Sequence, residues 1–231
     1  MARLGIIVFS RMSSKRLPGK ATLLFAALPL VQHVWSRARC TGYPVFLATS
    51  EQPEDDVLAR LAKIDGVPDF RGSLDDVLGR AADAAQHWNL DGFARLCGDR
   101  PFFCIDGMKR ALDALAAEIC SGSSDTGLLS NAIEDTPVAG LATEVIRTAA
   151  LKEAALHCAN DYQREHVTPV LYTGAKYSAV HLDDDPEYYR GPGMAVDTRS
   201  DYLRLSAVSK IDGRIDIPTR EVMALATKLW D

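Results

Sequence analysis

The stretch IIVFSRMSSKRLPGK, residues 6–20, decides how the chain begins to fold. An apolar strand is predicted over Leu4–Phe9, and it runs directly into a polar turn that Pro18 and Gly19 close. The cations of this turn are Arg11, Lys15, Arg16 and Lys20. A strand that brings backbone N–H groups and cations to one end of a sheet is suited to binding a polyphosphate; the alternative is a basic surface turn.

The spacing within this turn excludes two familiar phosphate-binding loops. A Walker A loop has a glycine five positions before its Gly-Lys pair and a hydroxyl after it, whereas here Ser14 precedes Gly19-Lys20 and Ala21 follows. A dinucleotide fingerprint has three glycines in its first turn, and this turn has only Gly19. The sequence therefore predicts a cation-rich loop of another kind.

Strand and helix candidates alternate after the loop. Helical spacing over Pro29–Arg39 and from Pro53 onward alternates with short buried strands at Val45–Ala48 and Phe93–Leu96. This order predicts parallel strands joined by right-handed crossovers. In such a sheet the ligand site lies at the carboxyl ends of the strands, where we expect the cation-rich loop to meet the Thr49-Ser50 turn.

The second half of the chain is predicted to extend the same layers. The predicted helices lie over Asp106–Cys120, Thr148–His157 and Pro218–Trp230, and another opens at Ser200-Asp201. The predicted strands lie at Leu128–Ser130, Gly140–Ile146 and Met194–Thr198, the last being the final core strand. The acidic run Asp183–Pro186 is predicted to be a solvated turn.

Two further segments carry candidate site residues. Asp99 follows a predicted strand directly, between a glycine and a proline, where a fixed backbone suits a metal ligand; a turn-forming aspartate is the alternative. Ser73 is predicted to cap a helix, with Asp75 and Asp76 in its first turn. That segment either only caps the helix or also contacts a nucleotide.

Five ordered strings of the sequence resemble one enzyme family. SRMSSKRLPGK (10–20) is similar to ARMGSTRLPGK, FRGSLDDVLGR (70–80) to FRGSEDDVLDR, RLCGDRP (95–101) to TGDxP, REHVTPV (164–170) to REHVTPY, and AVDTRSDYL (195–203) to VDTPEDL. These strings are typical of the cytidylyltransferases that activate sugar acids. The chain resembles most the spore-coat polysaccharide biosynthesis group, which is related to the 3-deoxy-manno-octulosonate and acylneuraminate cytidylyltransferases.

The resemblance implies a fold and a reaction. The fold would be α/β, a three-layer α/β/α sandwich with a mostly parallel sheet of the nucleotide-diphosphosugar transferase type. Residues 1–231 would form a single domain, with an arm for dimerisation or acceptor binding within 131–190. The reaction would join CMP from CTP to a sugar acid with release of pyrophosphate, with Mg²⁺ as cofactor, in a homodimer.

The resemblance also implies roles for particular residues. The nucleotide would contact Ser10, Arg11, Ser13, Lys20, Thr49, Arg71, Gly72, Ser73 and Gly98. Catalysis would depend on Arg11, Lys20 and Asp99, the metal ion would be held by Asp99 and Asp197, and the acceptor would lie near Arg164, Glu165 and His166. A hydrogen-bonded structural histidine is the alternative for His166.

Composition narrows the classes of partner. The formal net charge of −5 disfavours a general binder of nucleic acid or anionic membranes, which needs a broad positive surface. The apolar run at the N-terminus is too short for a signal peptide and no membrane-spanning stretch follows, so we expect a cytoplasmic protein. The five cysteines are widely spaced without a CxxC pair, which disfavours disulfides and a zinc site.

Several positions depart from the family strings. Phe9 stands where glutamine is common, Ser13 where glycine is common, Lys15 where threonine is common, and Gly193 where a larger residue is common. A side chain at Ser13 narrows the space for phosphate unless its hydroxyl binds it. Two alternatives stay open: a relative that binds nucleotide without turnover, and a nucleotidyltransferase that uses another base or a non-sugar acceptor.

Overall fold

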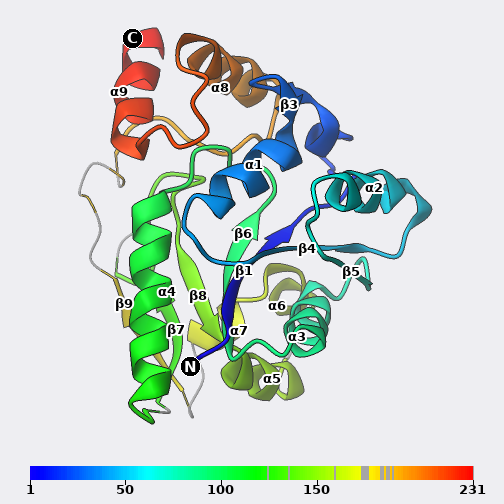
Figure 1. The fold of residues 1–231 in the computed structure, drawn as a ribbon, viewed down its shortest axis with the longest axis vertical. Coiled ribbons are helices and arrows are strands. Elements are labelled where there is room, and N and C mark those ends of the chain that lie inside the picture. The colour runs from blue at the N-terminus through cyan, green and yellow to red at the C-terminus, as the bar shows by residue number, and fades with distance from the viewer. Residues whose placement is uncertain are drawn as a thin grey trace.

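The computed structural model describes residues 1–123, 125–134, 136–158, 160–172, 177–182, 185, 188 and 190–230, and its centre is a seven-stranded sheet (Figure 1). The strand order is β5-β4-β1-β6-β8-β7-β9. The strands are β1 (Leu4–Phe9), β4 (Val45–Ser50), β5 (Asp69–Gly72), β6 (Gly92–Cys97), β7 (Thr126–Ser130), β8 (Glu144–Arg147) and β9 (Ser178–His181). Only β8 runs antiparallel to its neighbours, β6 and β7. The mostly parallel α/β sheet predicted from the sequence is confirmed.

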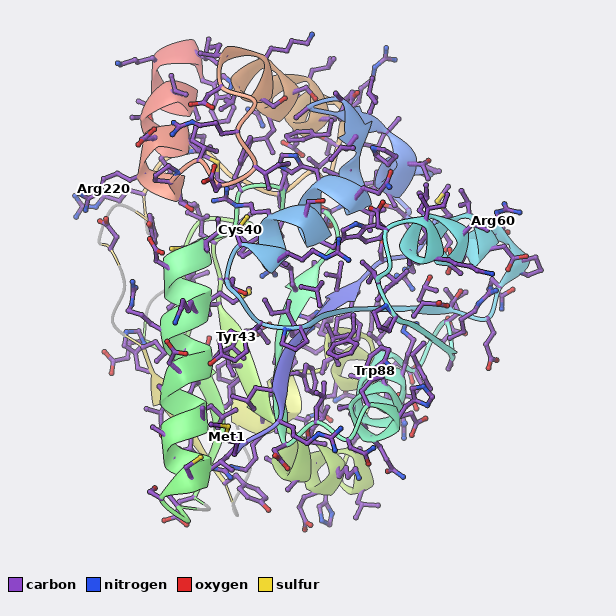
Figure 2. All side chains as sticks on the ribbon, viewed as in Figure 1. Met1, Cys40, Tyr43, Arg60, Trp88 and Arg220 are labelled. Carbon is purple, nitrogen blue, oxygen red and sulfur yellow. The ribbon has the colours of Figure 1, made fainter. Side chains whose placement is uncertain are left out.

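Helices cover both faces of this sheet. All six residues of β1 are buried, as expected for a strand enclosed on two faces. On one face Ile6 and Val8 pack with α1 (Leu30–Arg39), α2 (Asp56–Ile64) and α4 (Ile105–Cys120). On the other, Ile7 and Phe9 share a cluster with α3 (Val77–His87), α5 (Thr148–Leu156) and α7 (Pro169–Tyr172). On that second face Trp88 stacks on Phe46 of β4, with ring centroids 4.4 Å apart (Figure 2). The layers are those of an α/β/α sandwich.

A third apolar cluster lies beyond one end of the sheet. It is built by α8 (Arg199–Ile211) and α9 (Thr219–Trp230), which lie together in Figure 1, and by the small hairpin of β2 (Leu24–Phe25) and β3 (Leu28–Pro29). Phe102, which follows β6, is fully buried in this cluster. The cluster therefore fixes the segments that leave β1 and β6, where the site is expected.

Two local predictions, one for a turn and one for a helix cap, are corrected by the structure. Thr49 and Ser50 belong to β4 itself and not to a turn after it. The helix α3 begins at Val77 and is capped by Asp76, which accepts a hydrogen bond from the N–H of Gly79 at 2.9 Å; Ser73 instead accepts from the N–H of Asp76. A capping carboxylate nearer to the helix satisfies its free N–H groups better than a serine three residues earlier.

The predicted strand at Met194–Thr198 is also wrong. Met194 and Val196 are buried as the pattern required, but their N–H groups donate to the loop carbonyls of Ala139 and Asp99, at 2.6 and 2.8 Å. The segment bends at Ala195 and does not join the sheet. It ends at Thr198, whose side chain forms a capping box with Asp201 at the start of α8, close to the predicted helix start.

The remaining observations concern the predicted acidic turn, the short helices, membrane-spanning segments and the cysteines. Asp183, Asp184 and Pro186 of the predicted acidic turn lie outside the described residues. Short helical turns are formed by Lys20–Thr22 (η1) and Pro53–Asp55 (η2), and α6 (Asp161–His166) precedes α7. Within the described ranges, the helices are too short or too polar to cross a bilayer. All five cysteines are free thiols.

Candidate functional site

A cavity of about 660 Å³ opens at the carboxyl ends of β1 and β6. Its walls come from the loop after β1, from the start of α3, from α6 with the residues that follow it, and from the segment before α8. Predicted site residues that line the cavity are Ser10, Arg11, Lys20, Gly98, Asp99, Glu165, His166 and Asp197. This is the edge of the sheet where parallel strands place a ligand.

The cation-rich loop is fastened at both of its ends. The N–H of Met12 donates to Oδ1 of Asp55 at 2.7 Å, and Asp55 is itself buried. The N–H of Gly19 donates to the carbonyl of Met12 at 2.9 Å, which closes the loop on itself. Gly19 adopts φ 73°, a left-handed conformation that favours glycine, and Lys20 begins a short helical turn directly after it. The loop therefore presents Lys20 from a fixed backbone.

Lys20 joins the two predicted carboxylates. Its Nζ atom lies 2.5 Å from Oδ2 of Asp99, 3.2 Å from Oδ1 of Asp197 and 2.8 Å from the carbonyl oxygen of Val196. Arg16 forms an ion pair with the same oxygen of Asp197, with Nη2 at 2.8 Å. The structure thus brings together Lys20 and Asp197, which are 177 residues apart in sequence.

The same carboxylates are suited to a divalent cation. Both contact a single point, which the ammonium group of Lys20 occupies, and carboxylate oxygens are the ligands that Mg²⁺ prefers. No group of three or more His, Cys, Asp or Glu side chains that could hold a metal is found in the described ranges. Mg²⁺ characteristically keeps waters and substrate phosphates beside one or two carboxylates, so this donor set fits the ion.

Arg11 and Arg80 place two further guanidinium groups in the cavity wall. Arg11 donates through Nη2 to Oε1 of Glu165 at 3.2 Å and is partly exposed. Arg80 is only 3% exposed, donates to the carbonyl of Ser73, and its Nε has no partner in the described structure. Burial and the nearby charge of Arg11 lower the pKa of Arg80 to about 10, so it remains a cation at neutral pH. Sequence reasoning did not single out Arg80, although it ends the string FRGSLDDVLGR.

A buried ion pair forms the inner end of the cavity. Arg95 of β6 donates through Nη1 to Oε2 of Glu144 of β8 at 2.8 Å. Oε1 of Glu144 accepts from the hydroxyl of Thr168 at 2.7 Å and from that of Tyr172 at 3.4 Å. Burial by itself would raise the pKa of Glu144. The positive charges of Arg95 and Arg100 and the hydrogen bond from Thr168 have the larger combined effect, so the pKa of Glu144 is lowered. The sequence analysis did not identify this pair. A charged residue within an apolar strand is normally predicted to be solvent-exposed, and its buried partner is known only once the neighbouring strand is known.

Of the three predicted acceptor residues, two line the cavity and one does not. Glu165 and His166 line the cavity, and His166 packs against the ring of Tyr162 with centroids 4.4 Å apart. Arg164 does not line it, since its Nη1 donates to Oδ2 of Asp76 at 3.1 Å. Arg164 instead ties α6 to the start of α3.

Five predicted nucleotide contacts do not line the cavity: Ser13, Thr49, Arg71, Gly72 and Ser73. Ser13 is exposed, whereas Thr49 is fully buried within β4. Arg71 lies 2.5 Å from Oδ1 of Asp56 and donates to the carbonyls of Ser50 and Gln52. Its guanidinium therefore holds β5 to the start of α2. Arg80, nine residues later, lines the cavity instead.

Ser10 and Gly98 lie side by side at the strand ends. The N–H of Gly98 donates to the carbonyl of Phe9 at 2.8 Å, and a Cβ atom built on Gly98 would lie 2.9 Å from the side chain of Ser10. Any larger residue would push the two strand ends apart, which explains the glycine before Asp99.

Comparisons with known proteins agree with this geometry. The sequence profile described as cytidylyltransferase matches residues 5–201. The spore coat polysaccharide biosynthesis protein of Bacillus subtilis (strain 168) is 28% identical over 232 residues, covering 96% of this chain and 93% of that protein. A 3-deoxy-manno-octulosonate cytidylyltransferase of Stenotrophomonas maltophilia (strain K279a) is 31% identical over 138 residues, 58% of this chain and 52% of that protein.

A solved structure extends the agreement to the fold. The structure of a cytidylyltransferase from Leptospira borgpetersenii serovar Hardjo-bovis matches with a TM-score of 0.84 and 26% identity, covering 99% of this chain and 95% of that one. The predicted resemblance to the sugar-acid cytidylyltransferases, and to the spore-coat group among them, is confirmed. Since the profile spans most of its residues, the chain belongs to the cytidylyltransferase family.

Proposed function

We propose that the chain transfers the cytidylyl group of CTP to a hydroxyl of a sugar acid and releases pyrophosphate, in the synthesis of a surface polysaccharide or glycan. The observation that carries this proposal is the contact of Lys20 with both Asp99 and Asp197 in the lining of the cavity. Transfer from a nucleoside triphosphate needs cations and metal-holding carboxylates at one place, because charge on the phosphates dominates the barrier.

The reaction is an in-line displacement at phosphorus. The acceptor oxygen forms a bond to the α-phosphorus of CTP, the bond from that phosphorus to the bridging β-phosphate oxygen breaks, and the acceptor proton passes to water. The leaving pyrophosphate gains negative charge. Arg11, Lys20 and Arg80 line the cavity and are positioned to bind and stabilise it.

Three of the four loop cations have carboxylate partners in the described structure. Arg11 contacts Glu165, Arg16 contacts Asp197, and Lys20 contacts Asp99. Nucleotide phosphates would take over these cations, so that binding exchanges one set of ion pairs for another. The exchange leaves Asp99 and Asp197 free to hold a metal ion.

Asp99 and Asp197 would hold Mg²⁺ once Lys20 has moved to the phosphates. When bound, the ion would neutralise phosphate charge and acidify the acceptor hydroxyl. The side chain of Lys20 would then orient the phosphates, while its backbone stays fixed directly after Gly19. Arg80 would contribute a second cation, which burial has already desolvated. A buried guanidinium has lost most of its hydration before the ligand arrives, which strengthens its attraction for phosphate.

Ligand-dependent melting followed by product analysis tests the proposal. CTP, UTP, GTP and ATP are compared with MgCl₂; a nucleotide at a hundred times its Kd stabilises the fold by about 2.7 kcal/mol. Pyrophosphate release is then measured with CTP and 3-deoxy-manno-octulosonate, N-acetylneuraminate and other sugar acids. CTP-specific stabilisation with acid-dependent release supports the proposal. Stabilisation without release for any acceptor would identify a binding protein without turnover, and a preference for another base would contradict CTP as donor.

We also propose a homodimer formed through residues 131–190. In support, β9 ends the seven-stranded sheet, and Val180 on it is 36% exposed. An edge strand with an exposed apolar side chain is a surface that proteins commonly cover. Light scattering after size exclusion tests the assembly: a mass of twice 25.2 kDa is expected, and a monomer at micromolar concentration would contradict it.

A further inference from the structure

A strongly strained backbone position lies between two residues that line the cavity, His166 and Thr168. Val167, directly after α6, has φ 69° and ψ −62°. The N–H of Thr168 donates to the carbonyl of His166 at 2.8 Å, so that residues 166–168 form a γ-turn of the rare form with positive φ. Three other non-glycine residues in the described chain have positive φ, and they are two alanines and an asparagine, Ala26, Ala27 and Asn89. A β-branched residue in this region is a genuine outlier.

The surrounding structure holds Val167 in this conformation. Its side chain is fully buried in the cluster formed with α3, α5 and α7. Its N–H donates to the carbonyl of Gln163 at 3.0 Å, which ties the turn to α6. Strain of this kind costs about 1–3 kcal/mol and persists where neighbouring contacts impose it, often at functional sites.

Both neighbours of Val167 line the cavity. His166 faces it from the end of α6, and Thr168 donates its hydroxyl to Oε1 of Glu144 at 2.7 Å. Glu144 is in turn bound by Arg95 at the inner end of the cavity. An unstrained turn would direct the residues on either side of Val167 differently, so the turn sets the position of Thr168 and, through it, of the Glu144 carboxylate.

We propose that Val167 is a positioning residue for the acceptor: its strained turn seats Thr168 on Glu144 and so fixes that carboxylate as a hydrogen-bond acceptor for hydroxyl groups of the bound acceptor. This inference rests on the proposed transfer to a hydroxylated acceptor. The Glu144 carboxylate uses one oxygen for Arg95 and the other for Thr168 and Tyr172, and each carboxylate oxygen has two lone-pair directions. One direction at the oxygen facing Arg95 is therefore open to a ligand hydroxyl.

The first test compares Val167→Gly with Val167→Ala and Val170→Ala. Glycine adopts positive φ without strain, so Val167→Gly should melt at or above Val167→Ala although it carries one carbon fewer. Val170 is buried in the same cluster but lies in α7, so Val170→Ala removes the same two methyl groups without touching the turn. If Val167→Gly melts well below Val167→Ala, the turn is not strained and the proposal fails.

The second test measures the pKa of the Glu144 carboxylate in the absence of any acceptor substrate. Carbon-13 NMR of the glutamate carboxyls follows the titration of Glu144, which faces Arg95, Arg100 and Tyr172 as well as Thr168. Removing a hydrogen bond to the charged form raises a carboxyl pKa, and we expect a rise of about one pH unit in Thr168→Val and in Val167→Pro, because the proline ring fixes a negative φ and cannot form this turn. Thr168→Ser should restore the wild-type titration. Val167→Gly, which keeps the turn without strain, and Val170→Ala should leave it unchanged. An unchanged Glu144 titration in a folded Val167→Pro protein would overturn the proposal.

The third test uses the acid that gives the highest pyrophosphate release in the panel above. Val167→Pro and Thr168→Val should raise the acceptor KM by about tenfold, the equivalent of one hydrogen bond, with the CTP KM unchanged. Equal increases in both KM values would indicate general disorder of the cavity and overturn the positioning role. If no acid supports release, the proposed function fails, and the NMR titration still decides whether the turn positions Glu144.

Discussion

Lys20 and Asp99 are 79 residues apart in sequence, and the Nζ atom of Lys20 lies 2.5 Å from Oδ2 of Asp99. The side chains are 12% and 22% exposed, so the pair is shielded from solvent more than a surface ion pair. The lysine stands where the two predicted metal ligands converge. On the proposed function, we therefore expect nucleotide binding to separate Lys20 from Asp99 before a metal ion binds both carboxylates.

Asp99→Asn should reduce turnover by at least about a hundredfold, the scale of losing one preorganised electrostatic group. The amide keeps the shape but removes the charge that a divalent cation needs. Pyrophosphate release at saturating CTP measures the effect. Asp83→Asn, on the exposed face of α3, is the matched control and should behave like the wild type. Near-normal turnover in Asp99→Asn would remove Asp99 from the metal site.

Lys20→Met should affect nucleotide and metal in opposite directions. Loss of the ammonium group should raise the CTP KM and lower kcat, because Lys20 is expected to hold the phosphates. Without nucleotide, the same variant should bind Mn²⁺ more tightly than the wild type, since the ammonium group of Lys20 no longer competes for Asp99 and Asp197. Electron paramagnetic resonance of free Mn²⁺ measures that affinity.

Two results would contradict this account of Lys20. Unchanged CTP kinetics in Lys20→Met would place the lysine outside the nucleotide site. Weaker Mn²⁺ binding would show that Lys20 does not compete with the ion. Lys63→Met, at the end of α2, provides an exposed lysine control that should alter neither measurement.

Arg80→Met should raise the CTP KM by at least about tenfold, as expected when a charge-assisted hydrogen bond is lost. Arg80 is buried and its Nε lacks a partner in the described structure, so a phosphate oxygen is the natural acceptor. Arg80→Lys retains the charge and should recover part of the loss. The control is Arg60→Met, on the exposed surface of α2 (Figure 2). An unaltered CTP KM in a folded Arg80→Met protein would leave Arg80 with a structural role only.

The residues that were predictable from sequence are those whose signal is local. The apolar run Leu4–Phe9 and the turn after it indicated both the first strand and the cation-rich loop, and resemblance pointed to Asp99 and Asp197. Arg80, Arg95 and Glu144 were missed because buried charges become visible only once their partners on other elements are known. These three side chains depend on tertiary packing, which no single-segment pattern contains.

The errors have a physical cause of the same kind. Met194–Thr198 has the alternating burial of a strand, but its hydrogen bonds go to loops, and the pattern of apolar residues is the same in both cases. Arg71 belongs to a family-like string, yet Asp56 and two carbonyls hold its guanidinium outside the cavity. Similarity to a family motif identifies the segment, but it does not determine whether each side chain of that segment points into the cavity.

The burial of His33 leads us to expect that the free energy of unfolding depends on pH. It is 1% exposed, its Nε2 lies 3.2 Å from the carbonyl oxygen of Pro101, and Phe25 and Phe102 pack against its ring. Burial, with a smaller contribution from the charge of Arg37, lowers the pKa of His33 from 6.5 to about 4. In the unfolded chain the imidazole takes up a proton near its ordinary pKa, so the unfolded state binds more protons between these two values.

The free energy of unfolding should consequently fall as the pH is lowered through that window. His33 alone should account for a loss of about 2 kcal/mol between about pH 7 and pH 4.5. Urea unfolding of the wild type and of His33→Gln, which keeps a hydrogen-bond donor but cannot become charged, isolates this loss because all other groups titrate in both proteins. His157→Gln is the control, since the His157 side chain is 72% exposed, and it should follow the wild type. If His33→Gln loses as much stability as the wild type over the same range, His33 is not held neutral by the fold.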